Sequence, residues 1–238
     1  IGDCESAALV ARDGSIDWLC WPRFDSPACF AALLGDDGNG RWRIAPHSAV
    51  RNVTRRYRPE TLILETEFET EDGVVALIDF MPLRSGSSHI VRLVEGRGGR
   101  VAMAMELVLR FDYGSVVPWV TRGEDCALRA VAGPDLAVLR TPVETKGQGL
   151  TTVAAFEVGE GERVPFVLSY GPSHLPPPEA RDPAAALAET EAYWCEWRAA
   201  CTVDGPYGED VGRSLITLKA LTHMPTGGVI AAPTTSLP

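Results

Sequence analysis

Long apolar runs and an excess of positive charge are both missing from this sequence. No uninterrupted apolar stretch approaches the roughly 20 residues that a membrane-spanning helix requires. The 22 Lys and Arg residues against 32 Asp and Glu residues give a formal net charge of −10 at pH 7. Such a charge disfavours binding to phosphate backbones and to anionic lipid surfaces, so we expect neither nucleic acid nor a membrane as a partner.

Clustered metal ligands are missing as well. No CxxC pair and no Cys/His cluster at zinc spacing occurs, and the histidines are isolated, which predicts surface or helix-capping roles for them. We expect no metal, no cofactor, and free thiols as in a reducing cytosol. Residues 1–5 lack the basic-then-apolar pattern of a secretory signal, so we predict a cytoplasmic protein whose start is trimmed. The cysteines are Cys4, Cys20, Cys29, Cys126, Cys195 and Cys201, and the histidines are His47, His89, His174 and His223.

Signature motifs of several enzyme classes do not occur. No GxSxG, Walker, GxGxxG or HExxH pattern is found, so nucleophile-elbow hydrolases, P-loop enzymes, dinucleotide-binding proteins and zincins have no support.

Period-two alternation of apolar residues extends through about residue 170 and is typical of β-strands. Two pairs of strands flank Asp13-Gly14 and Asp72-Gly73, and Asp-Gly supplies the positive φ that a tight hairpin turn requires. Residues 101–111 alternate over a longer stretch, which predicts a strand in the middle of a sheet. Strands are predicted at 7–10, 16–21, 62–68, 74–80, 88–95, 101–111, 125–131, 135–142, 150–158 and 163–170. A single sheet that wide would curl or split, so we expect a mainly β fold of two packed antiparallel sheets over residues 1–172.

The pattern changes after this region. Prolines at 172 and 176–178 predict an extended linker, and Asp182-Pro183 is a strong helix start because the aspartate caps the helix and proline suits its first position. Trp194 and Trp197 then recur at helical spacing. A second helix is predicted from 207 to 223, with Val211, Leu215, Leu218 and Thr222 on one face. We place the linker and first helix at 173–205, and a further unit at 206–238.

The candidate site lies in the loop at residues 21–30. Trp21, Arg23, Phe24 and Asp25 lie between two prolines, and exposing so many aromatic and charged residues is costly. One interpretation is a sugar site, in which aromatic rings stack on a pyranose and Arg and Asp bind its hydroxyls. The other is a rigid domain interface, in which Arg23 and Asp25 satisfy each other or the nearby backbone.

Three further clusters have both a functional and a structural interpretation. Residues 110–114 contain Asp112, a conceivable acid, but a structural corner at a strand end explains them as well. Trp194 and Trp197 could form a stacking platform, although such a stripe usually belongs to a core. The arginines at 51, 55, 56 and 58 could bind an anion, but a solvated strand face explains them too.

A family resemblance rests on residues 13–27, Asp-Gly-Ser-Ile-Asp-Trp-Leu-Cys-Trp-Pro-Arg-Phe-Asp-Ser-Pro. This stretch, supported by the segments at 79–82, 110–114, 214–219 and 232–238, resembles the amino-terminal domain of prokaryotic glycoside hydrolase family 15, which includes glucoamylase-like and trehalase-like proteins. The resemblance implies a two-sheet supersandwich, linker helices and then an (α/α)₆ barrel, with residues 207–223 as the first barrel helix.

The resemblance also implies an activity. Family members invert the anomeric carbon of an α-glucosidic bond with one glutamic acid and one glutamate, both in the barrel beyond Pro238. We therefore expect no catalytic residue in this chain, which would serve as a scaffold with its own carboxyl-terminal catalytic domain as partner and an α-glucoside as the substrate of the whole protein. The alternative is a stand-alone carbohydrate-binding sandwich. An interface role predicts apolar surface on loop 21–30 and on helix 207–223, and hence possible self-association.

Overall fold

The structure is a computed structural model that describes residues 1–202 and 205–236. Fourteen strands, three short 3₁₀ helices and two α-helices occur in these residues. The strands are β1 Ala8–Val10, β2 Ser15–Cys20, β3 Ala28–Phe30, β4 Arg41–Pro46, β5 Val50–Tyr57, β6 Leu64–Thr70, β7 Gly73–Phe80, β8 Ser88–Val108, β9 Trp119–Arg122, β10 Leu128–Ala132, β11 Asp135–Arg140, β12 Lys146–Gln148, β13 Thr151–Gly159 and β14 Arg163–Pro172. The helices are η1 Ala32–Leu34, η2 Asp37–Asn39, η3 Asp112–Gly114, α1 Pro183–Ala199 and α2 Gly208–Ala220.

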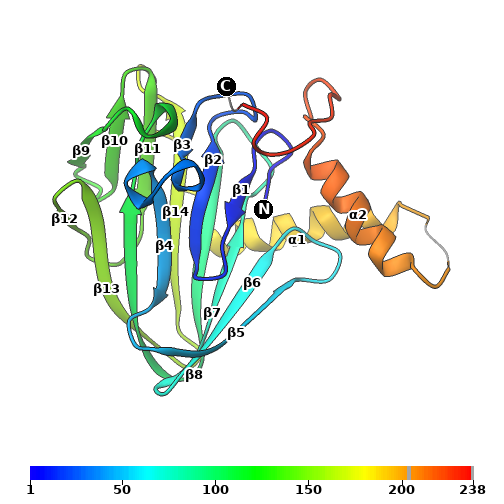
Figure 1. Cartoon of the computed structure of the whole chain (residues 1–238), viewed down its shortest axis with the longest axis horizontal. Coiled ribbons are helices and arrows are strands. Elements are labelled where there is room, and N and C mark those ends of the chain that lie inside the picture. Colours follow the sequence, from blue (N-terminus) through cyan, green and yellow to red (C-terminus); the bar gives the residue numbers. More distant parts are fainter. Residues whose placement is uncertain (203–204, 237–238) are drawn as a thin grey trace.

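The strands form two antiparallel layers that share β8 (Figure 1). The first half of β8 pairs with β7 and β14, and this layer continues to β5 on one side and to β9 on the other. The second half of β8 pairs with β4 and β13, and this layer continues to β1–β3 and to β12. The predicted mainly β, two-sheet antiparallel fold is confirmed.

Both predicted Asp-Gly hairpins are present. β1 pairs with β2 around Gly14, and β6 pairs with β7 around Gly73. The φ angles of these glycines are +82° and +155°, which a residue with a Cβ adopts only with strain. A Cβ at Gly14 would also lie 2.2 Å from the carbonyl oxygen of Ile44, so this position is closed to other residues.

The prediction of separate strands at 88–95 and 101–111 is wrong, because β8 runs unbroken from Ser88 to Val108. The glycines at 96, 98 and 99 permit a close crossing between the layers instead of a turn. A Cβ at Gly96 would lie 2.0 Å from the carbonyl oxygen of Gly159, and Gly99 has a φ of +69°. The bend lets one strand contribute to both sheets.

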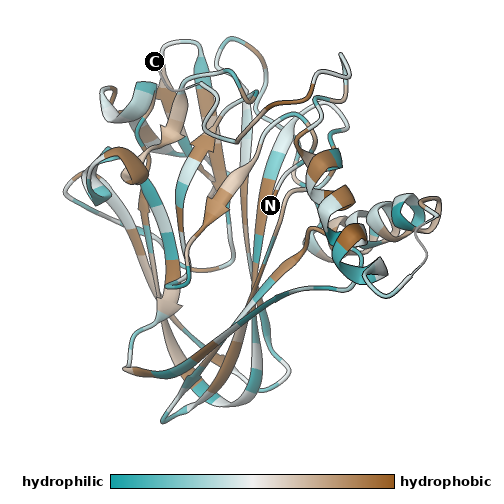
Figure 2. Cartoon of the chain, turned by 45° about the vertical axis from the view of Figure 1, so that its right-hand side comes forward, coloured by the Kyte–Doolittle hydropathy of each residue, from teal (hydrophilic) through white to brown (hydrophobic). Residues whose placement is uncertain are grey.

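The core lies between the two layers and contains Trp42, Phe68 and Phe166 among many buried apolar residues. In Figure 2, apolar residues recur along the strands of both layers. An ion pair crosses this core: Arg92 of β8 donates from Nε to Asp79 at 2.7 Å, from Nη1 to the carbonyl oxygen of Trp42 at 2.7 Å, and from Nη2 to that of Gly14 at 2.7 Å. Arg92 thereby links the two layers.

Helix α1 packs against the β7–β8–β14 layer, and α2 packs against α1 and against Cys4 and Leu62 (Figure 1). Asp182 caps α1 by accepting a hydrogen bond from the amide of Ala185, as its position before Pro183 predicts. Leu187 packs on the sheet, whereas Trp194 is fully buried with Ile216 of α2. Trp194 therefore belongs to the core, and it offers no stacking platform.

His89 corrects the expectation that all four histidines lie at the surface or cap helices. It is buried in β8, and its Nδ1 lies 2.8 Å from the Ser169 hydroxyl. Burial, reinforced by Arg181 and Arg140, lowers the pKa of His89 from 6.5 to about 4, so the imidazole is neutral in the folded protein near pH 7.

Within the described residues, no helix combines the length and apolar character needed to cross a membrane. The same residues bring together no group of three or more His, Cys, Asp or Glu side chains that could hold a metal ion.

Candidate interface site at one end of the sandwich

Trp21 begins the candidate loop and is buried beneath it. Its indole Nε1 donates to the Ser88 hydroxyl at 2.9 Å, and that hydroxyl donates to Asp3 at 2.8 Å. The ring also packs against Tyr170, with 5.7 Å between ring centroids. Trp21 is thus a positioning residue that fixes the loop to the sandwich.

Arg84 and the amino-terminal segment hold the loop from the other side. Arg84 donates from Nε to Asp3 at 2.8 Å, from Nη1 to Glu5 at 3.3 Å, and from Nη2 to the carbonyl oxygen of Pro22. Asp3 is fully buried, and it also accepts from the backbone amide of Ser6 at 2.7 Å. This network leaves the loop little freedom, because each buried charge has a partner.

Arg23 and Asp25 face solvent. They form a bidentate pair, with Arg23 Nε 2.8 Å from Asp25 Oδ1, and their side chains remain 56% and 60% exposed. The hydrogen bond from Arg23 holds the pKa of Asp25 below its usual range. Asp25 is therefore ionised near neutral pH and is unsuited to donate a proton in catalysis.

Phe24 is buried, with its ring 6.4 Å from that of His223, which follows the end of α2. Its backbone amide donates to the carbonyl oxygen of Glu5 at 2.9 Å. The expectation that this loop exposes apolar surface is consequently wrong, because Trp21, Phe24 and Phe30 are all covered by the chain itself.

The carboxyl-terminal segment of the described chain lies on the same end of the sandwich, where sequence reasoning assigned no contact. Trp18 Nε1 donates to the carbonyl oxygen of Pro233 at 2.8 Å, and the Tyr113 hydroxyl donates at 2.5 Å to that of Ser236. Cys20 Sγ lies 3.0 Å from the Ser236 hydroxyl. Leu237 and Pro238, which complete the motif at 232–238, lie outside the described residues.

Residues 110–114 form a turn that contacts this carboxyl-terminal segment. Tyr113 adopts a φ of +56° next to Gly114, which has a φ of +99°, and the turn presents the phenol ring 6.3 Å from that of Trp18. Asp112 is exposed and accepts a hydrogen bond from the Ser115 hydroxyl at 3.0 Å. The cluster is thus a structural corner that binds the 232–236 segment through Tyr113.

The four arginines at 51, 55, 56 and 58 have partners within the chain. Arg56 and Arg58 both bind Glu65 of β6, Arg51 pairs with Glu71, and Arg55 Nη2 donates to the carbonyl oxygen of Val10 at 2.8 Å. β5 is almost entirely exposed, which agrees with a solvated strand face.

Comparison with known proteins identifies the family. The model of the trehalase-like N-terminal domain family matches residues 1–194, which is most of the chain. The chain belongs to this family. The resemblance read from residues 13–27 is therefore confirmed at the level of a trehalase-like amino-terminal domain.

The relatives are longer than this chain. It is 33% identical to a trehalase of Mycolicibacterium smegmatis over 265 aligned positions, covering 100% of this chain and 39% of that protein. It is 31% identical to a trehalase of Thermoplasma acidophilum, covering 97% of this chain and 40% of that protein. The crystal structure of a bacterial glucoamylase in complex with acarbose superimposes with a TM-score of 0.66 at 12% identity, over 98% of this chain and 43% of that one. The chain thus spans about two fifths of the length of these relatives, and the structural match shows a shared fold.

Proposed function

We propose that this chain is the non-catalytic amino-terminal sandwich of an inverting α-glucoside hydrolase of glycoside hydrolase family 15, with trehalose as the first substrate to test. Its family membership and its similarity to trehalases support this proposal. In this view residues 1–172 form the sandwich, residues 173–205 the linker and first helix, and residues 206–238 the start of an (α/α)₆ catalytic barrel.

The observation that carries the proposal is the pair of hydrogen bonds that hold residues 233–236 on the sandwich. Trp18 and Tyr113 bind backbone carbonyl groups of this segment, so the sandwich holds part of the proposed barrel unit in a fixed position. A scaffold needs such a fixed contact, because catalytic groups in the domain it supports must be held to within a fraction of an ångström. Arg23 and Asp25 lie exposed on the same end and are proposed to contact that domain or to border its sugar site.

The chemistry follows from inversion. A glutamic acid protonates the glycosidic oxygen while a second glutamate activates water on the opposite face of the sugar. We place both glutamates in the barrel beyond Pro238, and none in this chain. The six free cysteines further support a reducing compartment, and we propose the cytoplasm.

The test compares this 238-residue chain with a protein that continues through the catalytic domain. Trehalose is added to each, and the anomers of the released glucose are followed by NMR before mutarotation. Inversion releases α- and β-glucose in equal amounts from each trehalose, whereas retention releases only the α-anomer. Hydrolysis by the 238-residue chain alone, or release of α-glucose only, would contradict the proposal.

A stand-alone carbohydrate-binding module is the alternative from a different class. Calorimetric titration of this chain with glucose, trehalose and maltose distinguishes it. Saturable binding that Arg23→Gln and Asp25→Asn abolish would favour the module over the scaffold.

A further inference from the structure

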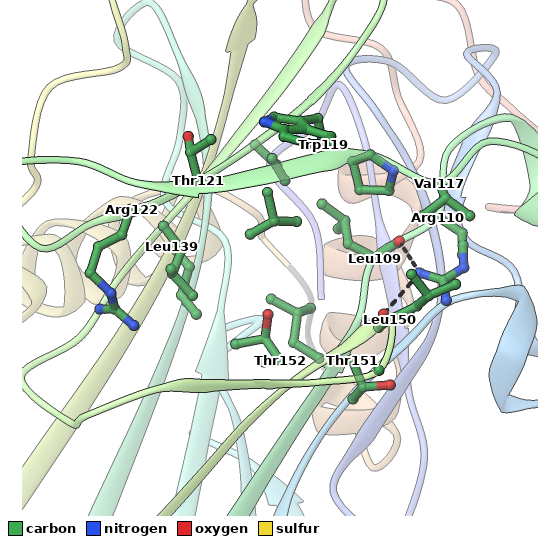
Figure 3. A pocket seen from close by; sticks show the side chains of 18 of the residues that line it. Leu109, Arg110, Val117, Trp119, Thr121, Arg122, Leu139, Leu150, Thr151 and Thr152 are labelled. Atoms are coloured by element: carbon green, nitrogen blue, oxygen red, sulfur yellow. Dashed lines mark hydrogen bonds between the residues drawn. The ribbon is translucent and has the colours of Figure 1, made fainter.

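A cavity of about 470 Å³ opens between the two layers of the sandwich. It lies where β9–β11 of one layer diverge from β12, β13 and the end of β8 in the other (Figures 1 and 3). Its volume falls in the usual range of sites for small molecules. The scaffold proposal does not involve this cavity, so an inference about it is independent of that proposal.

The walls of the cavity are apolar. Leu109 and Leu139 lie in its centre in Figure 3, and Trp119 lies over them on β9. The rim is exposed, with Trp119 78% and Leu150 66% accessible to solvent. A soluble protein rarely exposes a continuous apolar surface around a cavity unless that surface contacts a ligand or another molecule.

The charged residues that line the cavity are all cationic, although the chain carries a net charge of −10. They are Arg110, Arg122 and Lys146. Arg110 is 8% exposed and donates from Nη1 to the carbonyl oxygens of Leu109 at 2.7 Å and Leu150 at 3.2 Å. In the part of the chain that is described, no carboxylate lies within 4.0 Å of Arg110. Burial accordingly lowers the pKa of this guanidinium.

Arg122 lies on the opposite side of the cavity from Arg110 (Figure 3). It is exposed. Its Nη2 donates to the backbone and side-chain oxygens of Thr145 at 2.7 and 2.8 Å, and its Nη1 donates to the carbonyl oxygen of Cys126 at 3.2 Å. Lys146 is the residue after Thr145. Its one carboxylate partner among the described residues is the exposed Glu144, with 3.7 Å between Nζ and Oε1. This contact is too solvated to neutralise the charge of Lys146. Arg122 and Lys146 thus form an accessible cationic edge beside an apolar cavity.

The composition of the lining selects the class of ligand. A neutral sugar needs many hydrogen-bond acceptors and donors, but the lining residues include no Asp, Glu, Asn, Gln or His. A purely apolar molecule would leave the cationic edge unused. We propose that the cavity binds an amphipathic carboxylate, an unbranched fatty acid of medium length. Its hydrocarbon chain packs between Leu109, Leu139 and Trp119, and its carboxylate binds Arg122.

Decanoate is the probe, used with this chain below the concentration at which it forms micelles. Calorimetry is expected to show one saturable site, with decanol binding roughly tenfold more weakly because it lacks the charge. Decyltrimethylammonium has the opposite charge and should not bind. Equal affinity for decanoate and decanol, binding of the cationic amphiphile, no binding of decanoate, or displacement of decanoate by maltose would each overturn the proposal.

Two variants locate the site. Arg122→Gln is expected to weaken decanoate binding roughly tenfold without changing the affinity for decanol. Its matched control is Arg51→Gln on β5, which removes one exposed positive charge away from the cavity. Leu150→Asp places a negative charge on the exposed rim and should also weaken decanoate binding, which keeps the test decisive if Arg122→Gln unfolds. Unchanged binding in folded Leu150→Asp or Arg122→Gln protein would refute the assignment.

Discussion

Arg92 and Asp79 show at the scale of single residues how a buried charge can hold two sheets together. Both side chains are fully buried, and Arg92 also lies over the Trp42 ring, 5.1 Å from its centroid. Asp79→Asn removes the negative charge and leaves the guanidinium uncompensated. We expect a loss of about 3–5 kcal/mol in the free energy of unfolding, measured by urea denaturation.

The exposed pair of Arg51 and Glu71 supplies the control for that measurement. Its side chains are more than half exposed, so Glu71→Gln should cost at most about 1 kcal/mol. Equal losses of unfolding free energy in Asp79→Asn and Glu71→Gln would show that the buried pair stabilises the fold no more than the exposed pair does.

His89 gives the fold a dependence on pH. Its pKa is about 4 in the folded protein against 6.5 for an ordinary histidine, because burial and the nearby Arg181 and Arg140 disfavour the charged ring. Between these two values the unfolded chain binds a proton that the folded chain does not, so stability falls as the pH falls from 6.5 to 4. The contribution lost is roughly 2–3 kcal/mol.

The measurement for His89 is the free energy of unfolding at several pH values between 7 and 4. In His89→Gln the free energy of unfolding should fall less steeply with falling pH than in the unmodified chain. The titration of carboxylates affects both proteins equally, so the difference between the two curves reports on His89. His47→Gln changes an exposed histidine and is the matched control. Parallel curves for His89→Gln and the unmodified chain would contradict the argument.

At the scale of elements, the position of residues 233–236 on the sandwich depends on a few hydrogen bonds. Tyr113→Phe removes the bond to Ser236, which should cost about 0.5–1.5 kcal/mol locally and speed hydrogen exchange at residues 234–236 several-fold. Tyr170→Phe removes a hydroxyl that binds Asp135 and serves as the control. Unchanged exchange at 234–236 in Tyr113→Phe would show that this bond does not hold the segment.

The elements that local chemistry determines could be predicted from the sequence. Asp13-Gly14 and Asp72-Gly73 specify hairpins, and Asp182-Pro183 specifies the start of α1, because each depends on neighbouring residues only. The glycines at 96, 98 and 99 suggest a turn between two strands, but Gly96 instead allows a close approach to Gly159. Gly159 lies 63 positions after Gly96 in the sequence. Local pattern alone cannot distinguish a turn glycine from one that allows two backbones to approach.

The candidate site was harder to predict for the same reason. The loop at 21–25 stood out by composition, but its partners Asp3, Ser88 and Arg84 lie in distant segments. Trp18 and Pro233 are separated by 215 positions, and nothing in either segment indicates their contact. The sequence therefore showed which residues were unusual, and the fold showed that most of them position other parts of the chain.

At the scale of the whole molecule, α2 presents an apolar face that residues 1–202 and 205–236 leave uncovered. Gly212, Ile216 and Ala220 point inward, whereas Val211 and Leu218 are 41% and 54% exposed. The apolar surface predicted for this helix is therefore present.

Covering each large side chain of that face is worth at most roughly 1.5–3 kcal/mol, which favours contact with the proposed catalytic domain or with a second copy of the chain. We expect this chain to self-associate reversibly, with a weight-average mass in sedimentation equilibrium that rises with concentration. Val211→Ser combined with Leu218→Ser should abolish the rise, because both positions are exposed and the helix tolerates serine at small cost. Leu175→Ser alters a similarly exposed leucine outside α2 and should leave it unchanged. A monomer at all concentrations would mean that the net charge of −10 outweighs the apolar face, since like-charged copies repel as they approach.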